Sequence, residues 1–197
     1  MLPGAGNLAL SNAALVTGSL RGNTPLMQIP LVMTVLGKDR TGLVESIARL
    51  VADHGGNWQE SRMCRLGGEF AGILRVHVPR DQRASLERAL MQLSGLQIIV
   101  RSDEPAADLG VAHCATLEVL GPDRPGIVRE ITHALAGQGV NVEELETECA
   151  SAPMSGEPLF RAKARLRLPA SVTVAALRQS LAKPAAAMGL EFSFAAE

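Results

Sequence analysis

The sequence predicts the α+β fold class, arranged as two βαββαβ units in tandem. The segment that begins at Val35 is repeated, with substitutions, 84 residues further on at Val119. In both copies an apolar run of strand length leads into a stretch whose apolar residues recur every three or four positions, which is typical of a strand followed by an amphipathic helix. A chain of 197 residues is long enough for two small domains, each with its own core.

The first unit is predicted element by element from its hydrophobic pattern and its turn signals. β-Branched runs predict strands, a three-to-four-residue period predicts helices, and the Gly67–Gly68 pair predicts a hairpin turn. The predicted elements are a strand over 29–37, a helix from Thr41 to Gly55–Gly56, strands over 57–66 and 69–78, a helix over 81–93 and a strand over 96–102.

The second unit repeats this order. Its predicted elements are a strand over 113–121, a helix over 125–136, strands from Asn141 and from Leu159, a helix over 172–186 and a strand over 190–195. Each unit therefore has the order of a ferredoxin-like domain, with both helices on one face of an antiparallel sheet.

This order gives a domain division with domains over 28–103 and 112–197, joined by an acidic, Pro-containing linker over 104–111. Residues 1–27 form an N-terminal extension of unknown role, for which two interpretations stay open. Either Met27 is the true first residue, or the extension is an arm that packs on a partner.

The composition argues against several classes of function. With 19 basic and 20 acidic residues, the formal charge is -1, so bulk attraction to nucleic acid is not expected. The three cysteines and four histidines are scattered without metal-ligand or catalytic spacing, so we expect no metal, no cofactor and no enzyme activity. No apolar run is long enough to span a membrane, and we expect a cytoplasmic protein.

The strongest repeated feature is a Gly-x-Asp-Arg-x-Gly motif in the turn from the first strand to the first helix. Free backbone N–H groups and the helix dipole at such a turn favour a negatively charged group. We expect the first glycine of each copy to allow a tight turn and the second to allow close approach of a backbone or ligand. Pro125 is expected at the first helical position. The motif residues are Gly37, Asp39, Arg40, Gly42, Gly121, Asp123, Arg124 and Gly126.

The first helix of each unit is followed by a Gly-x-Asn sequence, which ends in Asn57 in the first unit and in Asn141 in the second. We expect the Asn amide to face back toward the turn, where it could bind a ligand; a role in stopping the helix is the alternative. For the Asp residues the alternative is bonding to backbone donors of the turn, and for the Arg residues it is solvation or pairing with those Asp residues.

A basic stripe is the main feature that favours nucleic-acid binding. Arg161, Lys163, Arg165 and Arg167 share one face of a predicted strand. Glu144, Glu146 and Glu148 alternate in the same way on the predicted hairpin partner, so we expect the opposite charges to pair across the two strands.

These units are similar to the ACT domain, and two in tandem resemble the glycine cleavage system transcriptional repressor family over about residues 28–196. The resemblance implies a non-enzymatic, amino-acid-responsive repressor that acts through a transcriptional activator or another regulatory protein. It implies a small amino acid such as glycine as effector, bound at the turns and at Asn57 or Asn141, and a possible homo-oligomer. Alternatives are a stand-alone regulatory subunit of a metabolic enzyme, a direct nucleic-acid binder and an oligomerisation module without ligand.

Overall fold

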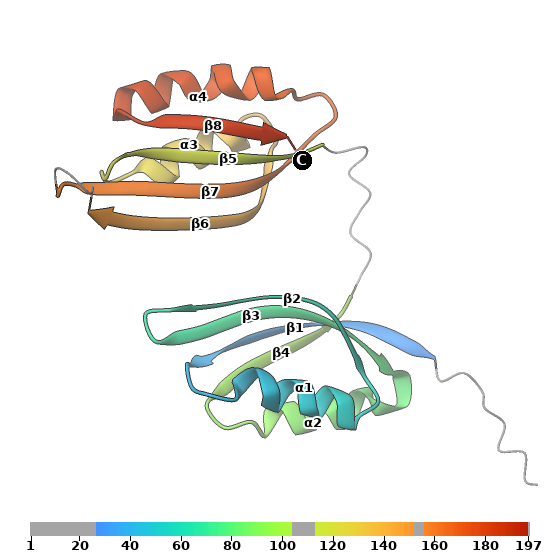
Figure 1. Ribbon diagram of the computed structural model, residues 1–197. Helices are drawn as coiled ribbons and strands as arrows, with labels where there is room; N and C mark the ends of the chain where they lie inside the picture. Colours follow the sequence, from blue (N-terminus) through green and yellow to red (C-terminus); the bar gives the residue numbers. More distant parts are fainter. Residues whose placement is uncertain (1–26, 104–112, 152–155, 197) are drawn as a thin grey trace, which may run out of the picture. The chain divides into compact units, whose positions relative to one another are not determined.

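The computed structural model describes residues 27–103, 113–151 and 156–196. The chain divides into two compact units, Met1–Pro105 and Ala106–Glu197 (Figure 1). The expected extension over 1–27 and linker over 104–111 lie, apart from Met27, outside the described residues.

Unit 1 has the predicted order of elements. They are β1 (Gln28–Lys38), α1 (Leu43–Asp53), β2 (Asn57–Leu66), β3 (Glu69–Pro79), the short 3-10 helix η1 (Arg80–Gln82), α2 (Arg83–Met91) and β4 (Leu96–Ser102). The sheet order is β2-β3-β1-β4, and every neighbouring pair is antiparallel. Alternate residues of the central strands, including Leu31, Met33 and Val35, point into the core beneath the helices.

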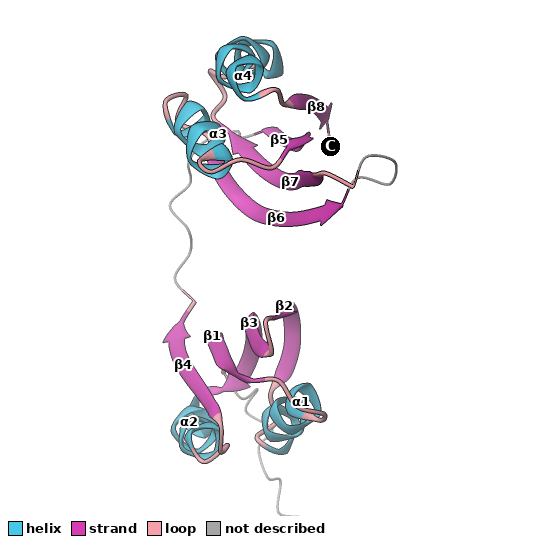
Figure 2. Ribbon diagram, turned by 90° about the vertical axis from the view of Figure 1, so that its left-hand side faces the viewer, coloured by secondary structure: helices cyan, strands magenta, loops and turns pink. Residues whose placement is uncertain are grey.

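Unit 2 repeats the arrangement around a separate core. Its elements are β5 (His113–Pro122), α3 (Ile127–Ala136), β6 (Asn141–Ser151), β7 (Pro158–Leu168), α4 (Val174–Met188) and β8 (Glu191–Ala196). The sheet order is β6-β7-β5-β8, again antiparallel. In both units the helices lie on one face of the sheet and leave the other face without helical cover (Figure 2). The ferredoxin-like α+β prediction is therefore confirmed.

Three helices end in the same way, with a glycine in the left-handed region directly after the last turn. After α1 the N–H of Gly55 donates to the carbonyl of Ala52 (2.9 Å) and the N–H of Gly56 to that of Val51 (2.8 Å). Gly139 after α3 and Gly189 after α4 are the corresponding glycines, with φ of 71° and 70°. This is the Schellman motif, so the Gly of each Gly-x-Asn sequence has a complete role in ending its helix.

Candidate functional site

The two motif turns have matching backbone connections to the neighbouring hairpin. In unit 1 the N–H of Asp39 donates to the carbonyl of Gly68 at 3.0 Å. In unit 2 the N–H of Asp123 donates to the carbonyl of Pro158, also at 3.0 Å. The repeated motif thus forms one backbone structure twice, at the same end of each sheet.

The structure exchanges the expected roles of the glycines. Gly42 and Gly126 have φ of 86° and 97°, and a Cβ added to either would meet nothing within 4 Å. These second glycines therefore supply the left-handed backbone conformation that directs the chain into the helix. No backbone in the described part of the chain approaches them closely, and the approach of a ligand stays a prediction.

Close approach instead occurs at the first glycine of each motif. A Cβ on Gly37 would lie 2.2 Å from the carbonyl oxygen of Gly95, and one on Gly121 would lie 2.8 Å from that of Gly189. Both glycines lie within strands, at the point where the turn before the last strand crosses them. They are required because a side chain would displace that turn, and not because the chain reverses there.

Both motif helices begin without a side-chain cap. Gly42 and Gly126 are the N-cap residues of α1 and α3, and neither helix start has a capping side chain. In contrast, the Thr173 hydroxyl at the start of α4 accepts a hydrogen bond from the N–H of Ala176 at 3.2 Å. Pro125, expected at the first helical position, precedes this N-cap, because the left-handed Gly126 delays α3 to Ile127. The first-turn N–H groups of α1 and α3 therefore remain suited to an anionic group.

In unit 1 the charged side chains of the turn have partners within the unit. The Asp39 carboxylate pairs with Nε of Arg65 at 2.5 Å, and Lys38 pairs with Glu69. Arg40 donates to the carbonyl of Ser94 at 3.4 Å. The partners come from other segments of unit 1, and Asp39 and Arg40 are not paired with each other.

In unit 2 the corresponding Asp meets a thiol instead of an arginine. Cys149 is 84 residues after Arg65, the same spacing as Asp123 after Asp39, so the two copies place different residues opposite the same carboxylate. Desolvation raises the pKa of the exposed Cys149 thiol, and the charge of Asp123 and a hydrogen bond to it raise that pKa further. Within the described parts of unit 2, neither Asp123 nor Arg124 forms an ion pair.

The asparagines do not lie beside the turns of their own units, contrary to expectation. Lys38 at the turn pairs with Glu69, whereas Asn57 pairs with His77, eight residues further along β3 (69 to 77). At about 3.3 Å per residue, these two levels are roughly 26 Å apart. In unit 2, Pro122 pairs with Leu159 and Asn141 pairs with Arg167, and these two partners are again eight residues apart along β7. The intervening helix returns the chain to the far end of the sheet.

The arginines of the basic stripe are paired as predicted, and a bulge adds a glutamate that the alternation missed. Arg165 lies opposite Glu144, Lys163 opposite Glu146 and Arg161 opposite Glu148. A register shift between Val142 and Glu144 brings in Glu143, whose carboxylate lies 3.3 Å from Arg165 and 2.5 Å from Arg167. Bulge residues break the period of two, so alternation alone could not find Glu143.

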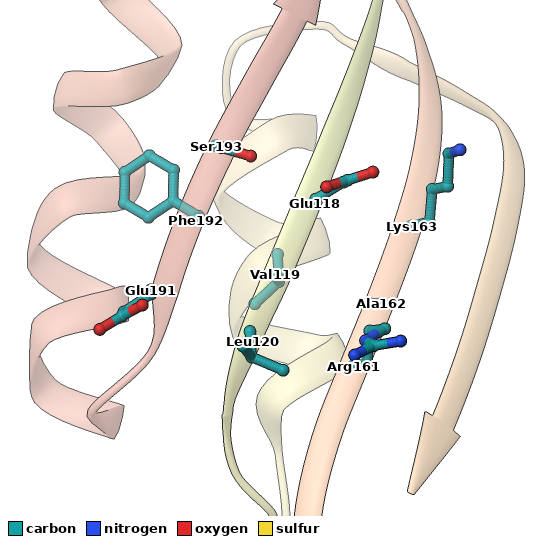
Figure 3. A pocket seen from close by; sticks show the side chains of 9 residues that line it. All are labelled: Glu118, Val119, Leu120, Arg161, Ala162, Lys163, Glu191, Phe192 and Ser193. Carbon is teal, nitrogen blue, oxygen red and sulfur yellow. The ribbon is translucent and has the colours of Figure 1, made fainter.

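A shallow hollow of about 520 Å³ lies on the helix-free side of the unit 2 sheet (Figure 3). Glu118 and Lys163 project from the neighbouring strands β5 and β7, and Glu191 and Ser193 come from β8. None of its lining residues belongs to the motif or to the Gly-x-Asn sequence. The hollow is therefore separate from the candidate site at the turn.

Two searches of the described residues returned nothing. In residues 27–103, 113–151 and 156–196, no three His, Cys, Asp or Glu side chains gather as a metal ion would require. No helix in those same ranges has the length and apolar character needed to cross a membrane.

Comparison with known protein families finds two matches. Residues 30–101 match one model of the ACT domain, and residues 115–178 match a second model of the ACT domain. Together the matches cover most of both compact units.

Among curated proteins, the glycine cleavage system transcriptional repressor of Escherichia coli K12 is 26% identical over 154 residues, covering 76% of this chain and 80% of the repressor. A crystal structure of an unknown protein from Galdieria sulphuraria superposes with a TM-score of 0.76 at 31% identity, covering 87% of this chain and 99% of that one. A candidate glycine cleavage system transcriptional repressor superposes with a TM-score of 0.60 at 20% identity, covering 87% and 98%, which shows a shared fold. These similarities support a regulatory role.

Proposed function

The chain belongs to the ACT-domain family, with two ACT domains in tandem, and from that premise we propose that it is a non-enzymatic, amino-acid-responsive repressor of glycine cleavage system transcription. The observation that carries the proposal is its similarity, over 76% of its length, to the repressor of that system in Escherichia coli. It acts in the cytoplasm through a protein partner, a transcriptional activator or another regulatory protein.

Contact with a protein, rather than with DNA, is supported by the charges on the surface. The arginines of the basic stripe already have glutamate partners on the neighbouring strand, including Arg161 with Glu148 at 3.3 Å and Arg165 with Glu143 at 3.3 Å. Phosphate binding would have to break these pairs, and the net charge of -1 supplies no general attraction.

We place the effector, a small amino acid such as glycine, at the turn of unit 2. The zwitterion needs one anionic and one cationic partner, and the unit 2 turn presents Asp123, Arg124 and the uncapped start of α3. The carboxylate would bind the first-turn N–H groups and Arg124, while the ammonium would bind Asp123. In unit 1, Asp39 is already neutralised by Arg65. The two copies of the motif are thus assigned different roles.

Calorimetry with glycine, serine and alanine tests this assignment on the full chain. Asp123→Ala and Arg124→Ala should each weaken binding by about tenfold to a hundredfold, which corresponds to about 1.4–2.7 kcal/mol for the loss of one charge-assisted contact. The matched variants Asp39→Ala and Arg40→Ala should leave the affinity unchanged. Equal losses from both sets would show that the assignment to unit 2 is wrong.

Partner capture tests the regulatory part separately. A tagged full chain should retain a transcriptional regulator from extract of the source cells. The amount of regulator retained should change when glycine is added. Retention of a metabolic enzyme in its place would favour the regulatory-subunit alternative. If neither the wild-type chain nor any variant binds an amino acid, the proposed amino-acid response is contradicted. The result of partner capture would still be judged on its own.

A further inference from the structure

The residue that faces the motif carboxylate differs between the two units, although its place in the sheet does not. In unit 1, Arg65 and Gly37 of the motif lie on either side of Phe70, in one row across three strands. In unit 2, Cys149 takes the place of Arg65 in the corresponding row, opposite Phe160. The fold therefore brings an arginine to the motif turn of one unit and a thiol to that of the other.

This difference changes the charge at the two turns. Nε of Arg65 lies 2.5 Å from the Asp39 carboxylate and neutralises it. In unit 2 the Cys149 thiol makes a hydrogen bond with Asp123 instead, and its raised pKa keeps it neutral. A neutral donor satisfies part of the hydrogen-bonding capacity of the carboxylate without cancelling its charge.

An amino acid carries an ammonium group, which binds best to a carboxylate whose charge is not already balanced. Asp123 forms no ion pair among the described residues of unit 2. Building on the proposed placement of the effector, we propose that the residue facing the motif carboxylate decides whether that turn binds an amino acid. Cys149 leaves the unit 2 turn open to an ammonium group, and Arg65 closes the unit 1 turn to it.

The exposure of the pair in unit 1 sets the size of this effect. The Arg65 side chain is 67% exposed and that of Asp39 is 31% exposed, so the pair is weaker than a buried one. An ammonium group that enters this turn must displace the arginine and also lie beside its like charge. We therefore expect a difference of about tenfold in affinity between a turn that faces a thiol and one that faces an arginine.

Exchanging the two residues in the full chain tests the proposal. Cys149→Arg gives unit 2 the residue that the fold of unit 1 already carries, so it should fold. In calorimetry its affinity for glycine should fall about tenfold, and the loss should shrink at high salt because it arises from competing charges. Cys149→Ser keeps a neutral donor and should restore the wild-type affinity. The reciprocal variant Arg65→Cys should raise the number of glycine molecules bound from one to two per chain.

Leu145→Arg is the control for an added positive charge on β6. Leu145 is 45% exposed and lies four residues before Cys149, on the same side of the strand. At about 3.3 Å per residue the two positions are roughly 13 Å apart, which is more than the screening length at physiological salt. This variant should bind glycine with the wild-type affinity.

Wild-type affinity in a folded Cys149→Arg chain would overturn the proposal, and so would a single glycine site in Arg65→Cys. If Cys149→Arg does not fold, the number of sites in Arg65→Cys decides. A tenfold loss in Cys149→Ser or Leu145→Arg would also overturn the proposal, because the neutral charge of the thiol would then not be the cause. A wild-type chain that binds none of glycine, serine and alanine would overturn the proposed amino-acid response itself and this inference with it.

Discussion

Individual glycines of the repeated motif differ in what they require. Gly37 and Gly121 lie against backbone carbonyls, while Gly42 and Gly126 have open space but a left-handed backbone. A substitution therefore fails for a steric reason at the first pair and for a conformational reason at the second. Alanine, which adds only a Cβ, distinguishes the steric penalty from the conformational one by the size of the destabilisation at each position.

Gly37→Ala should destabilise unit 1 by about 3 kcal/mol, because its Cβ would lie 2.2 Å from the Gly95 oxygen and the turn before β4 would have to move. Gly42→Ala should cost only about 1–2 kcal/mol, the penalty for a left-handed non-glycine residue. Denaturant unfolding of the full chain measures both, with Gly121→Ala and Gly126→Ala as the matched pair in unit 2. If Gly37→Ala and Gly42→Ala destabilised unit 1 equally, and Gly121→Ala and Gly126→Ala destabilised unit 2 equally, the steric role of the first glycine and the conformational role of the second would be contradicted.

The thiol opposite Asp123 provides a test of the unit 2 turn that needs no ligand. A raised pKa means less thiolate at a given pH, so Cys149 should react slowly with an alkylating reagent at mildly alkaline pH. Asp123→Asn removes the negative charge and should speed that reaction, although desolvation will keep the pKa above its ordinary value. Mass spectrometry of the Cys149 peptide gives the rate against pH.

The control is Asp39→Asn, which changes the corresponding carboxylate in unit 1 and should not alter the Cys149 rate. An unchanged Cys149 rate in Asp123→Asn would mean that the carboxylate does not face the thiol.

At the scale of the element, the β6–β7 hairpin is held by a bulge that turns Glu143 toward two arginines. The Glu143 side chain is 14% exposed, while Arg165 and Arg167 are 32% and 45% exposed. Nε of Arg165 is buried and has no hydrogen-bond partner in the described structure, so that guanidinium depends on its contacts with Glu143 and Glu144. A partly buried carboxylate shared by two arginines stabilises more than an exposed pair does.

Glu143→Ala should therefore destabilise unit 2 by about 1–2 kcal/mol, less than for a fully buried pair because the arginines are partly solvated. Glu148→Ala removes the partner of Arg161 in a pair that is 61% and 65% exposed, and should cost about 0–0.5 kcal/mol. Denaturation curves of the two variants at low and high salt compare them. A larger effect from Glu148→Ala would show that the bulge has no special role.

The whole molecule combines two similar units with different surfaces. Unit 1 has a neutralised turn and an apolar helix-free face, while unit 2 has an uncompensated turn and a charged helix-free face. This difference between the copies supports the proposed assignment of the effector to unit 2.

The net charge of -1 and the paired stripe lead to one prediction for the intact chain. At physiological salt it should not shift DNA or RNA in a gel, because the arginines of the stripe are already neutralised by glutamates. A submicromolar, salt-dependent complex that is weakened by Arg161→Ala, Lys163→Ala or Arg165→Ala would contradict it. Glu118→Ala, on the same face, controls for a general change of surface.

The sequence by itself determined the order of the elements, the buried side of each element and the duplication. Strand and helix periodicities are local properties of the sequence, and the packing of each unit buries the apolar sides that they indicate. It also predicted the charge pairing of the β6–β7 hairpin, since alternation carries facing residues along both strands. Phe160, which alternates with the stripe on the same strand, is 6% exposed.

Only the tertiary structure decided which of these residues meet. Asn57 is close to the motif in sequence but far from it along the sheet, because α1 returns the chain to the opposite end. Glu143 joined the arginines because a bulge shifted the register, and Gly37 was needed because a distant turn crosses it. These outcomes depend on contacts between segments far apart in the chain, and a local pattern carries no information about them.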